Sequence, residues 1–454
     1  MTEQQYNSEI EYIFNRFPSF QKVGGSAYKP GIDGMRALAD ATGNPHTKFK
    51  SIHIAGTNGK GSTSHMIASA LGSAGNEVRV GLYTSPHLVD FRERIKIMGP
   101  DGYQMVPKEY VYTFIQTYKH LFEELGSSFF EITTALAFSW FASMEVDIAV
   151  IECGLGGRLD STNIISPELS IITNIGLDHC DFLGSTIESI ASEKAGIIKS
   201  GVPVIISEES GAGDVFRKAA AEKGAPIIFA EDYSPELFDA AIDLDKLDLK
   251  GACQERNIKG VAAALDILLK MGLEWNSGAV VDPMAVVVSM KQGIYNAAEH
   301  TGLHGRWEKL SEKPYVVCDT GHNSHGFKLL GEQISKSFRE GKFKRLFMVF
   351  GVVADKDIDS IVEYLPNECI NGYGERVKAN YFFVNAKGTR ALSAEKLKNK
   401  MNSEGFEGKI ISDGNIFCTL QHCMENMSQV SDMLFIGGST FVVAEAIPYF
   451  KKID

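Results

Sequence analysis

The chain of 454 residues is long enough for two or three domains, and its 44% hydrophobic and 22% charged residues are typical of a globular protein. A net charge of −12 argues against a general nucleic-acid or membrane-surface binder and leaves room only for a local basic pocket. The polar N-terminus, the seven scattered cysteines and the absence of an apolar run near the ~20 residues of a membrane span predict a cytoplasmic protein with reduced thiols.

Strand-like runs alternate with helical patterns along the whole chain, which predicts an α/β protein with mostly parallel sheets. In the first part, the predicted strands are 50–55, 78–83, 146–152, 169–174 and 202–207. In the second part, they are 314–319, 345–351, 380–386, 408–412 and 433–437. The breaker-rich stretch 300–306 marks the join between the two series. We therefore expect a P-loop-type domain at 1–296 and a smaller, Rossmann-like α/β domain at 297–454.

The most informative motif follows the first predicted strand and is a glycine-rich loop with one lysine, Gly56-Thr57-Asn58-Gly59-Lys60-Gly61-Ser62-Thr63. A strand, a glycine turn and a helix N-terminus place backbone N–H groups where phosphates can bind. Lys60 adds a positive charge, and Ser62 or Thr63 can offer a hydroxyl to a phosphate-bound Mg²⁺. The motif predicts nucleotide binding. It departs from the usual P-loop, because two residues rather than four precede the Gly-Lys pair and Gly61 follows the lysine.

Polar residues also end other strands of the first part. Glu152 ends the strand 146–152, and a strand-end acid beside a phosphate loop commonly holds Mg²⁺, although an exposed terminal glutamate is the alternative. The segment Thr84-Ser85-Pro86-His87 follows the strand 78–83, where an ordinary Ser-Pro turn would look the same. Phe130 lies where a helix is expected to open, and its ring suits either the core or a ligand platform.

His179 follows the predicted strand 169–174, after a run of apolar residues. Its imidazole fits a metal ligand that Asp178 or Asp181 would orient. A single histidine after a strand is also a common structural hydrogen-bonding residue, so the spacing leaves both interpretations open.

A helix is predicted next, with a capping-box pattern at Ser185 and Glu188 and an apolar stripe that contains Lys194. Either the Lys194 ammonium extends from the edge of the stripe to water, or the side chain is desolvated. Burial would lower the pKa of the amine, and a neutral amine reacts with CO₂ to form a carbamate, which is a metal-binding anion. The sequence alone does not show this modification.

In the second part, Asp319, His322 and Asn323 cluster at the end of the strand 314–319. This is the clearest group of polar residues in a domain that otherwise lacks obvious catalytic side chains. The segment Asp355-Lys356-Asp357 follows the next strand, where a charged surface loop is an equally good interpretation.

In this order, the motifs resemble those of the folylpolyglutamate and dihydrofolate synthases of the Mur ligase superfamily over nearly the whole chain. Each match is weak alone, whereas the ordered set is specific. The matching stretches are His53–Ser62, Thr84–His87, Glu152–Asn163, Leu177–His179, Glu193–Ile197, Gln254 with Asn257, Gly305–Arg306, Asp319 with His322–Asn323, and Asp355–Asp357. Two details depart from the family pattern: His304 stands where a proline is common, and Thr320-Gly321 replaces the commoner Gly-Ala.

The resemblance implies where the ligands of this chain bind. ATP would bind to the loop 56–62, with Lys60 at the β- and γ-phosphates and with further contacts from Asn257, Arg306 and Asp319. Two Mg²⁺ ions would lie among Ser62, Ser85, Glu152, His179 and Lys194, with Lys194 carbamylated. His322 would serve the glutamate site, and Phe130 and Asp160 the pterin pocket. The residues expected to take part in catalysis are Lys60, His179, Lys194, Arg306 and His322. A monovalent cation is a further ion that the resemblance allows.

The implied reaction activates a carboxylate. ATP phosphorylates the free carboxylate of a folate to an acyl phosphate, and the amino group of L-glutamate attacks it to form an amide. The stretch 158–163 is closer to the bifunctional pattern, which adds dihydropteroate as a substrate. The expected partners are these small molecules, with no nucleic acid and no membrane, and the chain is expected to be a monomer.

Two other functions compete with this interpretation. A peptidoglycan-precursor ligase of the same superfamily usually carries a UDP-binding domain before the loop, and only 55 residues precede Gly56 here. A nucleotide-switched binding protein would use the phosphate loop but would leave the Asp319 and His322 cluster without a role.

Overall fold

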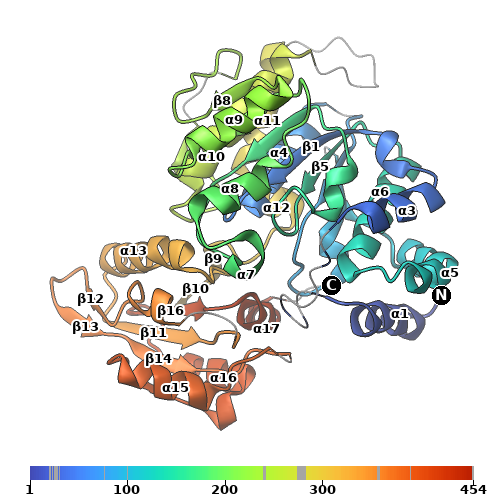
Figure 1. Cartoon of the computed structure of the whole chain (residues 1–454). Coiled ribbons are helices and arrows are strands. Elements are labelled where there is room, and N and C mark those ends of the chain that lie inside the picture. Colours follow the sequence, from blue (N-terminus) through green and yellow to red (C-terminus); the bar gives the residue numbers. More distant parts are fainter. Residues whose placement is uncertain are drawn as a thin grey trace. The chain divides into compact units, whose positions relative to one another are not determined.

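The structure is a computed structural model that describes residues 1–19, 22, 24, 29, 31–75, 77–99, 101–238, 242–272, 283–354, 358–388 and 390–451. The chain forms two compact α/β units, which are drawn in Figure 1. The first contains residues 1–248 and 253–303, and the second contains residues 249–252 and 304–454. The boundary that the sequence suggests, between residues 296 and 297, stays a prediction.

The first unit is built on an eight-stranded sheet with the order β4-β3-β2-β5-β1-β6-β7-β8. Its strands are β1 (Lys50–Ala55), β2 (Val80–Tyr83), β3 (Ile95–Gly99), β4 (Gly102–Met105), β5 (Ile148–Glu152), β6 (Leu169–Ile172), β7 (Val204–Ile206) and β8 (Ile227–Phe229). The pairs from β2 to β8 are parallel, whereas β3 and β4 are antiparallel at one edge. All five predicted strands are confirmed, and β3, β4 and β8 were missed.

Helices cover this sheet. They are α1 (Glu3–Arg16), α3 (Asp33–Ala41), η2 (Pro45–Thr47), α4 (Lys60–Gly72), η3 (Phe91–Arg94), α5 (Lys108–Glu124), α6 (Phe129–Ser143), η4 (Ser161–Ile164), α7 (Cys180–Leu183), α8 (Ile187–Ala195), α9 (Gly213–Lys223), η5 (Leu244–Lys246), α10 (Gln254–Lys270), α11 (Pro283–Tyr295) and α12 (Ala297–Thr301). One apolar cluster joins α5 and α6 to β2, β3 and β5, and another joins α8 and α9 to β6 and β7. Because β2, β5, β6 and β7 are buried along their whole lengths, their sequences are mostly apolar rather than alternating, with Ser170 in β6 and Glu152 at the end of β5 as the polar exceptions.

The start of α8 corrects one prediction. The capping box is not formed by Ser185 and Glu188; the N-cap is Thr186, and Ser189 takes the reciprocal position. The Ser189 hydroxyl accepts a hydrogen bond from the Thr186 N–H, a role that a longer Glu or Gln side chain usually fills, so the sequence pattern pointed one residue too early. The predicted apolar stripe is confirmed, because Ile190, Ala191 and Lys194 are buried.

The second unit has a six-stranded sheet with the order β15-β14-β11-β16-β10-β9 and a separate β12-β13 pair. Its strands are β9 (Glu308–Glu312), β10 (Tyr315–Cys318), β11 (Arg345–Phe350), β12 (Glu368–Ile370), β13 (Arg376–Lys378), β14 (Asn380–Phe383), β15 (Gly408–Lys409) and β16 (Asp432–Gly437). Its helices are α13 (Ser324–Glu340), α14 (Asp359–Val362), α15 (Ala394–Ser403), η6 (Ser412–Gly414), α16 (Ile416–Asn426) and α17 (Thr440–Phe450). The five predicted strands are confirmed and mostly parallel, and the antiparallel edge strand β9 was missed.

The strand order of the first unit brings several loops together at one edge. β5 lies between β1 and β2, and β6 lies on the other side of β1. These strands are parallel, so their carboxyl ends share an edge of the sheet. The glycine-rich loop after β1 is therefore flanked by the residues that follow β5 and β6. In the described part of the chain, no helix is long and apolar enough to cross a membrane.

Candidate functional site

The glycine-rich loop adopts a backbone conformation that only glycine accommodates. Gly56 has a φ of +153°, and a Cβ atom there would lie 1.8 Å from the Thr173 Oγ1 atom. Gly59 is left-handed, with a φ of +82°, and a Cβ atom there would lie 2.3 Å from the Asn257 Oδ1 atom. α4 begins at the next residue, Lys60, so its N-terminus opens directly from this tight turn. The arrangement matches that of a phosphate-binding helix start.

Residues after β6 hold the loop in place. The Thr57 N–H donates to the Asn174 carbonyl oxygen at 3.0 Å, and the Asn58 N–H donates to the Asn174 Oδ1 atom at 2.8 Å. In return, the Thr173 hydroxyl donates to the Asn58 carbonyl oxygen at 2.6 Å. These contacts preorganise the loop. Sequence analysis did not assign Thr173 and Asn174 to the site, although the polar end of their strand was a signal.

The start of α10 contacts the same loop from the other side. The Asn257 Nδ2 atom donates to the Gln254 Oε1 atom at 2.9 Å, and the Gln254 Nε2 atom donates to the Ser62 hydroxyl at 3.4 Å. All three side chains are buried, and Gly61 and Ser62 lie in the first turn of α4. The structure therefore brings the predicted residue Asn257 to the loop, together with Gln254.

Two lysines converge on one carbonyl oxygen of the loop. The Lys60 Nζ atom donates to the Gly56 oxygen at 2.9 Å and to the Thr57 oxygen at 3.3 Å. The Lys194 Nζ atom also donates to the Gly56 oxygen, at 2.9 Å. Lys194 is 4% exposed, which decides between the two interpretations of this side chain in favour of desolvation. Burial, assisted by the positive charge of Lys60, lowers the pKa of Lys194 to about 7.

Glu152 is buried at the end of β5, so it is not an exposed strand terminus. Its Oε2 atom accepts a hydrogen bond from the Ser85 N–H at 3.2 Å, which ties the loop after β2 to β5. His179 has a left-handed backbone as the N-cap of α7, and its Nε2 atom lies 3.8 Å from an Asp178 carboxylate oxygen. Across the described residues, no group of three or more His, Cys, Asp and Glu side chains could hold a metal ion by itself.

Asp160 and Phe130 frame the loop that follows β5. The buried Asp160 carboxylate accepts hydrogen bonds from the Leu155 N–H at 2.9 Å and from the Thr162 N–H and hydroxyl at 2.9 and 2.5 Å. Burial raises the pKa of Asp160, and these donors oppose the rise. The Phe130 ring lies against Gly154, where a Cβ atom would meet its Cζ atom at 2.6 Å. Their assignment to a pterin pocket stays a prediction.

In the second unit, Arg306, Asp319 and His322 gather where β10 ends. The Asp319 carboxylate accepts hydrogen bonds from the Trp307 and Gly321 N–H groups, each at 2.7 Å. Burial raises the pKa of Asp319, and the charge of Arg306 opposes the rise. The Nδ1 atom of His322 lies 3.0 Å from the Thr320 carbonyl oxygen.

The two departures from the family pattern both contribute to the position of Arg306. The Arg306 Nη1 atom donates to the hydroxyl of Thr320, which in turn donates to the Gly305 carbonyl oxygen at 3.1 Å. His304 Nδ1 lies 2.9 Å from the carboxylate of Glu308, which also accepts from the Gly305 N–H at 2.7 Å.

Glu308 also binds the Lys451 ammonium at 2.5 Å. Burial alone would raise the pKa of Glu308, but the hydrogen bond and charge of His304 and the hydrogen bonds from Lys451 and the Gly305 N–H lower it to about 2. The carboxylate is therefore ionised at neutral pH. The predicted segment 355–357 lies outside the described residues.

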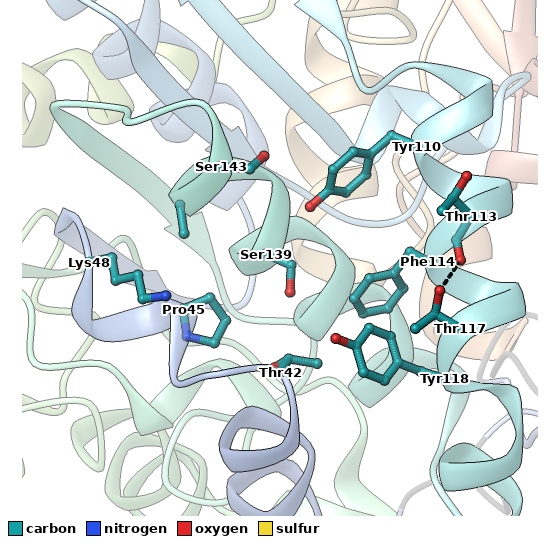
Figure 2. A pocket seen from close by; sticks show the side chains of 11 residues that line it. Thr42, Pro45, Lys48, Tyr110, Thr113, Phe114, Thr117, Tyr118, Ser139 and Ser143 are labelled. Atoms are coloured by element: carbon teal, nitrogen blue, oxygen red, sulfur yellow. Dashed lines mark hydrogen bonds between the residues drawn. The ribbon is translucent and has the colours of Figure 1, made fainter.

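A separate cavity of about 370 Å³ lies in the first unit among α5, α6 and the segment around η2. Figure 2 shows Thr42, Pro45 and Lys48 on one side, residues of α5 on the other, and Ser139 between them. Lys48 lies just before the start of β1, and Ser143 lies before the start of β5, whereas the phosphate loop follows the carboxyl end of β1. None of the predicted site residues lines the cavity.

Comparison with known proteins agrees with this geometry. The Mur ligase middle domain family matches residues 54–256, which include the phosphate loop and Lys194. The dihydrofolate synthase/folylpolyglutamate synthase of Bacillus subtilis is 36% identical over 360 residues, covering 74% of this chain and 79% of the relative. The chain belongs to the dihydrofolate synthase/folylpolyglutamate synthase family.

Solved structures of this family share the fold. The structure of Escherichia coli FolC in complex with DHPP and ADP has a TM-score of 0.76 and 26% identity and covers 98% of this chain and 97% of its own. A bifunctional folylpolyglutamate synthase/dihydrofolate synthase with Mn, AMPPNP and L-glutamate bound has a TM-score of 0.73 and 25% identity, with 93% and 94% covered. The family resemblance and the α/β fold inferred from the sequence are thus confirmed.

The close approach of Gly59 to Asn257 generates a prediction for this family member. Gly59→Ala should weaken the binding of ADP at least about tenfold, because the new methyl group displaces Asn257. The left-handed backbone of an alanine at this position costs a further ~1–2 kcal/mol. Gly201→Ala is the matched control, since Gly201 has a φ of +72° and open space around it. Isothermal titration with ADP and thermal unfolding of both variants test this. Equal ADP affinity in the two variants would contradict the steric explanation.

Proposed function

We propose that this protein is an ATP-dependent ligase that joins L-glutamate to folates and to dihydropteroate through an acyl phosphate. The observation that carries the proposal is the lysine-bearing loop at 56–62, held by the end of β6 and by α10, with the buried Lys194 on its carbonyl oxygen. The bound DHPP, ADP and L-glutamate of the related structures support this choice of substrates.

The reaction proceeds by two transfers. An oxygen of the substrate carboxylate attacks the γ-phosphorus of ATP, which forms the acyl phosphate and releases ADP. The amino group of L-glutamate then attacks the carbonyl carbon, phosphate leaves with the C–O bonding electrons, and the nitrogen loses a proton to give the amide. No covalent bond to the enzyme is required. The task of the protein is to bind the reactants, to stabilise charge and to exclude water from the acyl phosphate.

The phosphate loop and α4 would bind the nucleotide. We assign the backbone N–H groups at the start of α4 and the Lys60 ammonium to the phosphates. Lys60 would exchange its hydrogen bonds with the Gly56 and Thr57 oxygens for phosphate oxygens, which are stronger acceptors because they are charged. Asn257, placed beside Gly59, would contact the nucleotide from α10.

The donor set around the loop fits divalent cations. Ser62, Ser85 and Glu152 supply hydroxyl and carboxylate oxygens, which Mg²⁺ prefers, and His179 supplies an imidazole nitrogen. The buried Glu152 carboxylate next to Ser85 is the clearest indication, because it places a carboxylate oxygen, a ligand that Mg²⁺ prefers, at a strand end beside the phosphate loop. Bound Mg²⁺ would neutralise phosphate charge during transfer. Two ions and a monovalent cation stay predictions, as does a monomeric, cytoplasmic protein.

Lys194 is proposed to carry a carbamate. Its amine is buried, shares its acceptor with Lys60 and has a pKa lowered to about 7, so the neutral, nucleophilic form is accessible under ordinary conditions. Attack of the amine on the carbon of CO₂, with loss of one proton, gives an anion. An anion at this position would pair with Lys60 and offer oxygens to a metal ion, whereas two ammonium groups at one carbonyl oxygen repel each other.

In the second unit, Arg306 is proposed to stabilise charge on the transferring phosphoryl group, and Asp319 and His322 to complete the nucleotide and glutamate sites. The hydrogen bonds of Thr320 and Gly305 to the Arg306 guanidinium support this assignment, because they fix the side chain before any ligand binds.

The central prediction is glutamate-dependent phosphate release from Mg·ATP. Both tetrahydrofolate and dihydropteroate should support turnover, measured in parallel in a coupled phosphate assay with a mass-spectrometric check of the amide product. If only tetrahydrofolate supported turnover, the protein would be a folate ligase, and the proposed dihydrofolate synthase activity would be wrong. No turnover with either acid, in protein that binds ATP, would refute the proposed function.

We expect the carbamate of Lys194 to give a ¹³C carbonyl signal after the protein is equilibrated with ¹³C-bicarbonate. The signal should grow as the pH rises through about 7, because the lowered pKa of Lys194 makes its amine neutral above that pH. Lys194→Gln should lose both the signal and turnover. Lys199→Gln is the control, since Lys199 is a nearby, partly buried lysine whose pKa burial also lowers. An active enzyme without this signal would exclude the modification.

Because the Thr320 hydroxyl accepts a hydrogen bond from Arg306, we expect two substitutions of Thr320 to differ in kcat/KM. Thr320→Val should lower kcat/KM by about tenfold or more, because a hydrogen bond to a charged group contributes about 1.5–3 kcal/mol. Thr320→Ser retains the hydroxyl and should keep most of the activity. Steady-state kinetics with thermal unfolding as a control test the pair. The role assigned to Thr320 would be wrong if Val and Ser behaved alike.

A further inference from the structure

The segment between β2 and β3 is held far more tightly than an exposed charged turn would be. The Glu93 carboxylate accepts hydrogen bonds from three consecutive backbone N–H groups at 2.7, 2.9 and 2.7 Å, those of Leu88, Val89 and Asp90. The Thr84 N–H donates to the Arg94 carbonyl oxygen at 3.0 Å. With the Ser85 N–H bound to Glu152, the backbone of 84–90 is fixed at both ends.

Within this segment, a buried arginine determines the tautomer of His87. Arg94 is 4% exposed, and its guanidinium lies 5.3 Å from the centre of the Phe129 ring. Its Nε atom donates to the His87 Nδ1 atom at 2.7 Å. Since a guanidinium has donors and no acceptor, the Nδ1 atom must present its lone pair. The neutral ring then carries its proton on Nε2, and this follows from the identity of the two groups rather than from assigned hydrogens.

His87 is therefore a fixed hydrogen-bond donor and not a metal ligand. Its Nδ1 atom is occupied by Arg94, and its Nε2 atom is protonated. Among the described residues, the Nε2–H group has no hydrogen-bond partner, and the ring packs at 6.0 Å from Phe91. His179 differs, because its neighbour is the carboxylate of Asp178, an arrangement that suits a metal ligand.

We propose that the His87 Nε2–H group donates a hydrogen bond to an oxygen of the substrate's reacting carboxylate, and that Arg94 is a positioning residue that enforces this tautomer. The inference deepens the proposed ligase function and rests on it. His87 follows Ser85 by two residues, in the loop that Glu152 ties to the edge where the phosphate loop lies. We therefore assign the acceptor to an oxygen of the substrate carboxylate that is activated at this edge of the sheet.

A neutral, fixed donor suits this reaction. The carboxylate oxygen bears negative charge before phosphoryl transfer, and the carbonyl oxygen becomes an oxyanion when the amine attacks. A hydrogen bond to that oxygen strengthens as charge develops, so it lowers the barrier more than it tightens substrate binding. The histidine transfers no proton, since Arg94 prevents protonation at Nδ1 and the Nε2 proton only forms a hydrogen bond.

Two amide substitutions separate the donor from the packing. His87→Asn places an acceptor near the Nδ1 position for Arg94 and leaves no donor at the Nε2 position. His87→Gln reaches the Nε2 position with an N–H group. We expect His87→Asn to lower kcat by about 10²-fold, as loss of one oxyanion donor does elsewhere, with the KM for ATP and the unfolding temperature nearly unchanged. His87→Gln should recover much of the lost kcat.

The proposal is overturned if His87→Asn keeps the parent kcat, if it raises only the KM for ATP, or if Gln and Asn lose activity equally. An independent readout uses the unaltered protein with ¹⁵N-labelled histidine, and His87→Asn identifies the resonances. The Nε2–H tautomer is expected at neutral pH, and an Nδ1–H or a cationic ring would overturn the role of Arg94. Absence of glutamate-dependent phosphate release in the parent protein would instead refute the ligase function, and the tautomer would still be decided.

Discussion

The rest of the site depends on the carbonyl oxygen of Gly56, which accepts hydrogen bonds from the ammonium groups of both Lys60 and Lys194. This geometry needs the unusual backbone of Gly56, and Thr173 packs so close that no side chain fits there. Two cations at one oxygen repel each other, so one of them gains from becoming neutral. Burial selects Lys194, whose pKa falls, while Lys60 stays closer to solvent. The loop thus sets both the phosphate site and the unusual state of the second lysine.

Much of the site could be predicted because it consists of local motifs at strand ends. The phosphate loop and Glu152 lie at the ends of strands whose apolar character is evident from the sequence, and parallel strands bring their ends to one edge of the first sheet. Asp319 follows an apolar strand of the second sheet. The ten predicted strands could be recognised for the same reason, because their sequences are largely apolar. Two of the missed strands, β4 and β9, are antiparallel edge strands, and their burial patterns show that much of their surface faces solvent. Their sequences therefore lack the continuous apolar run that identified the others.

Residues whose role arises only from tertiary contacts could not be predicted. Arg92, Glu93 and Arg94 are three consecutive charged residues, a pattern typical of a solvated surface, yet Glu93 binds three backbone N–H groups and Arg94 is buried against Phe129. Lys194 posed the same difficulty, since an apolar stripe does not reveal how deeply a lysine within it is buried. In these cases the partner lies elsewhere in the fold, and sequence spacing carries no information about it.

Glu308 has a consequence for the dynamics of the second unit. One carboxylate holds Lys451, just beyond the last helix α17, and the N–H group of Gly305, next to Arg306. The segment around Gly305 and the residue after α17 thus bind the same carboxylate. Helix ends commonly fray and open locally. Each opening of the end of α17 would release one of the partners that keep Glu308 ionised and in place, so the order of the Arg306 segment is linked to that of a helix end more than a hundred residues away in sequence.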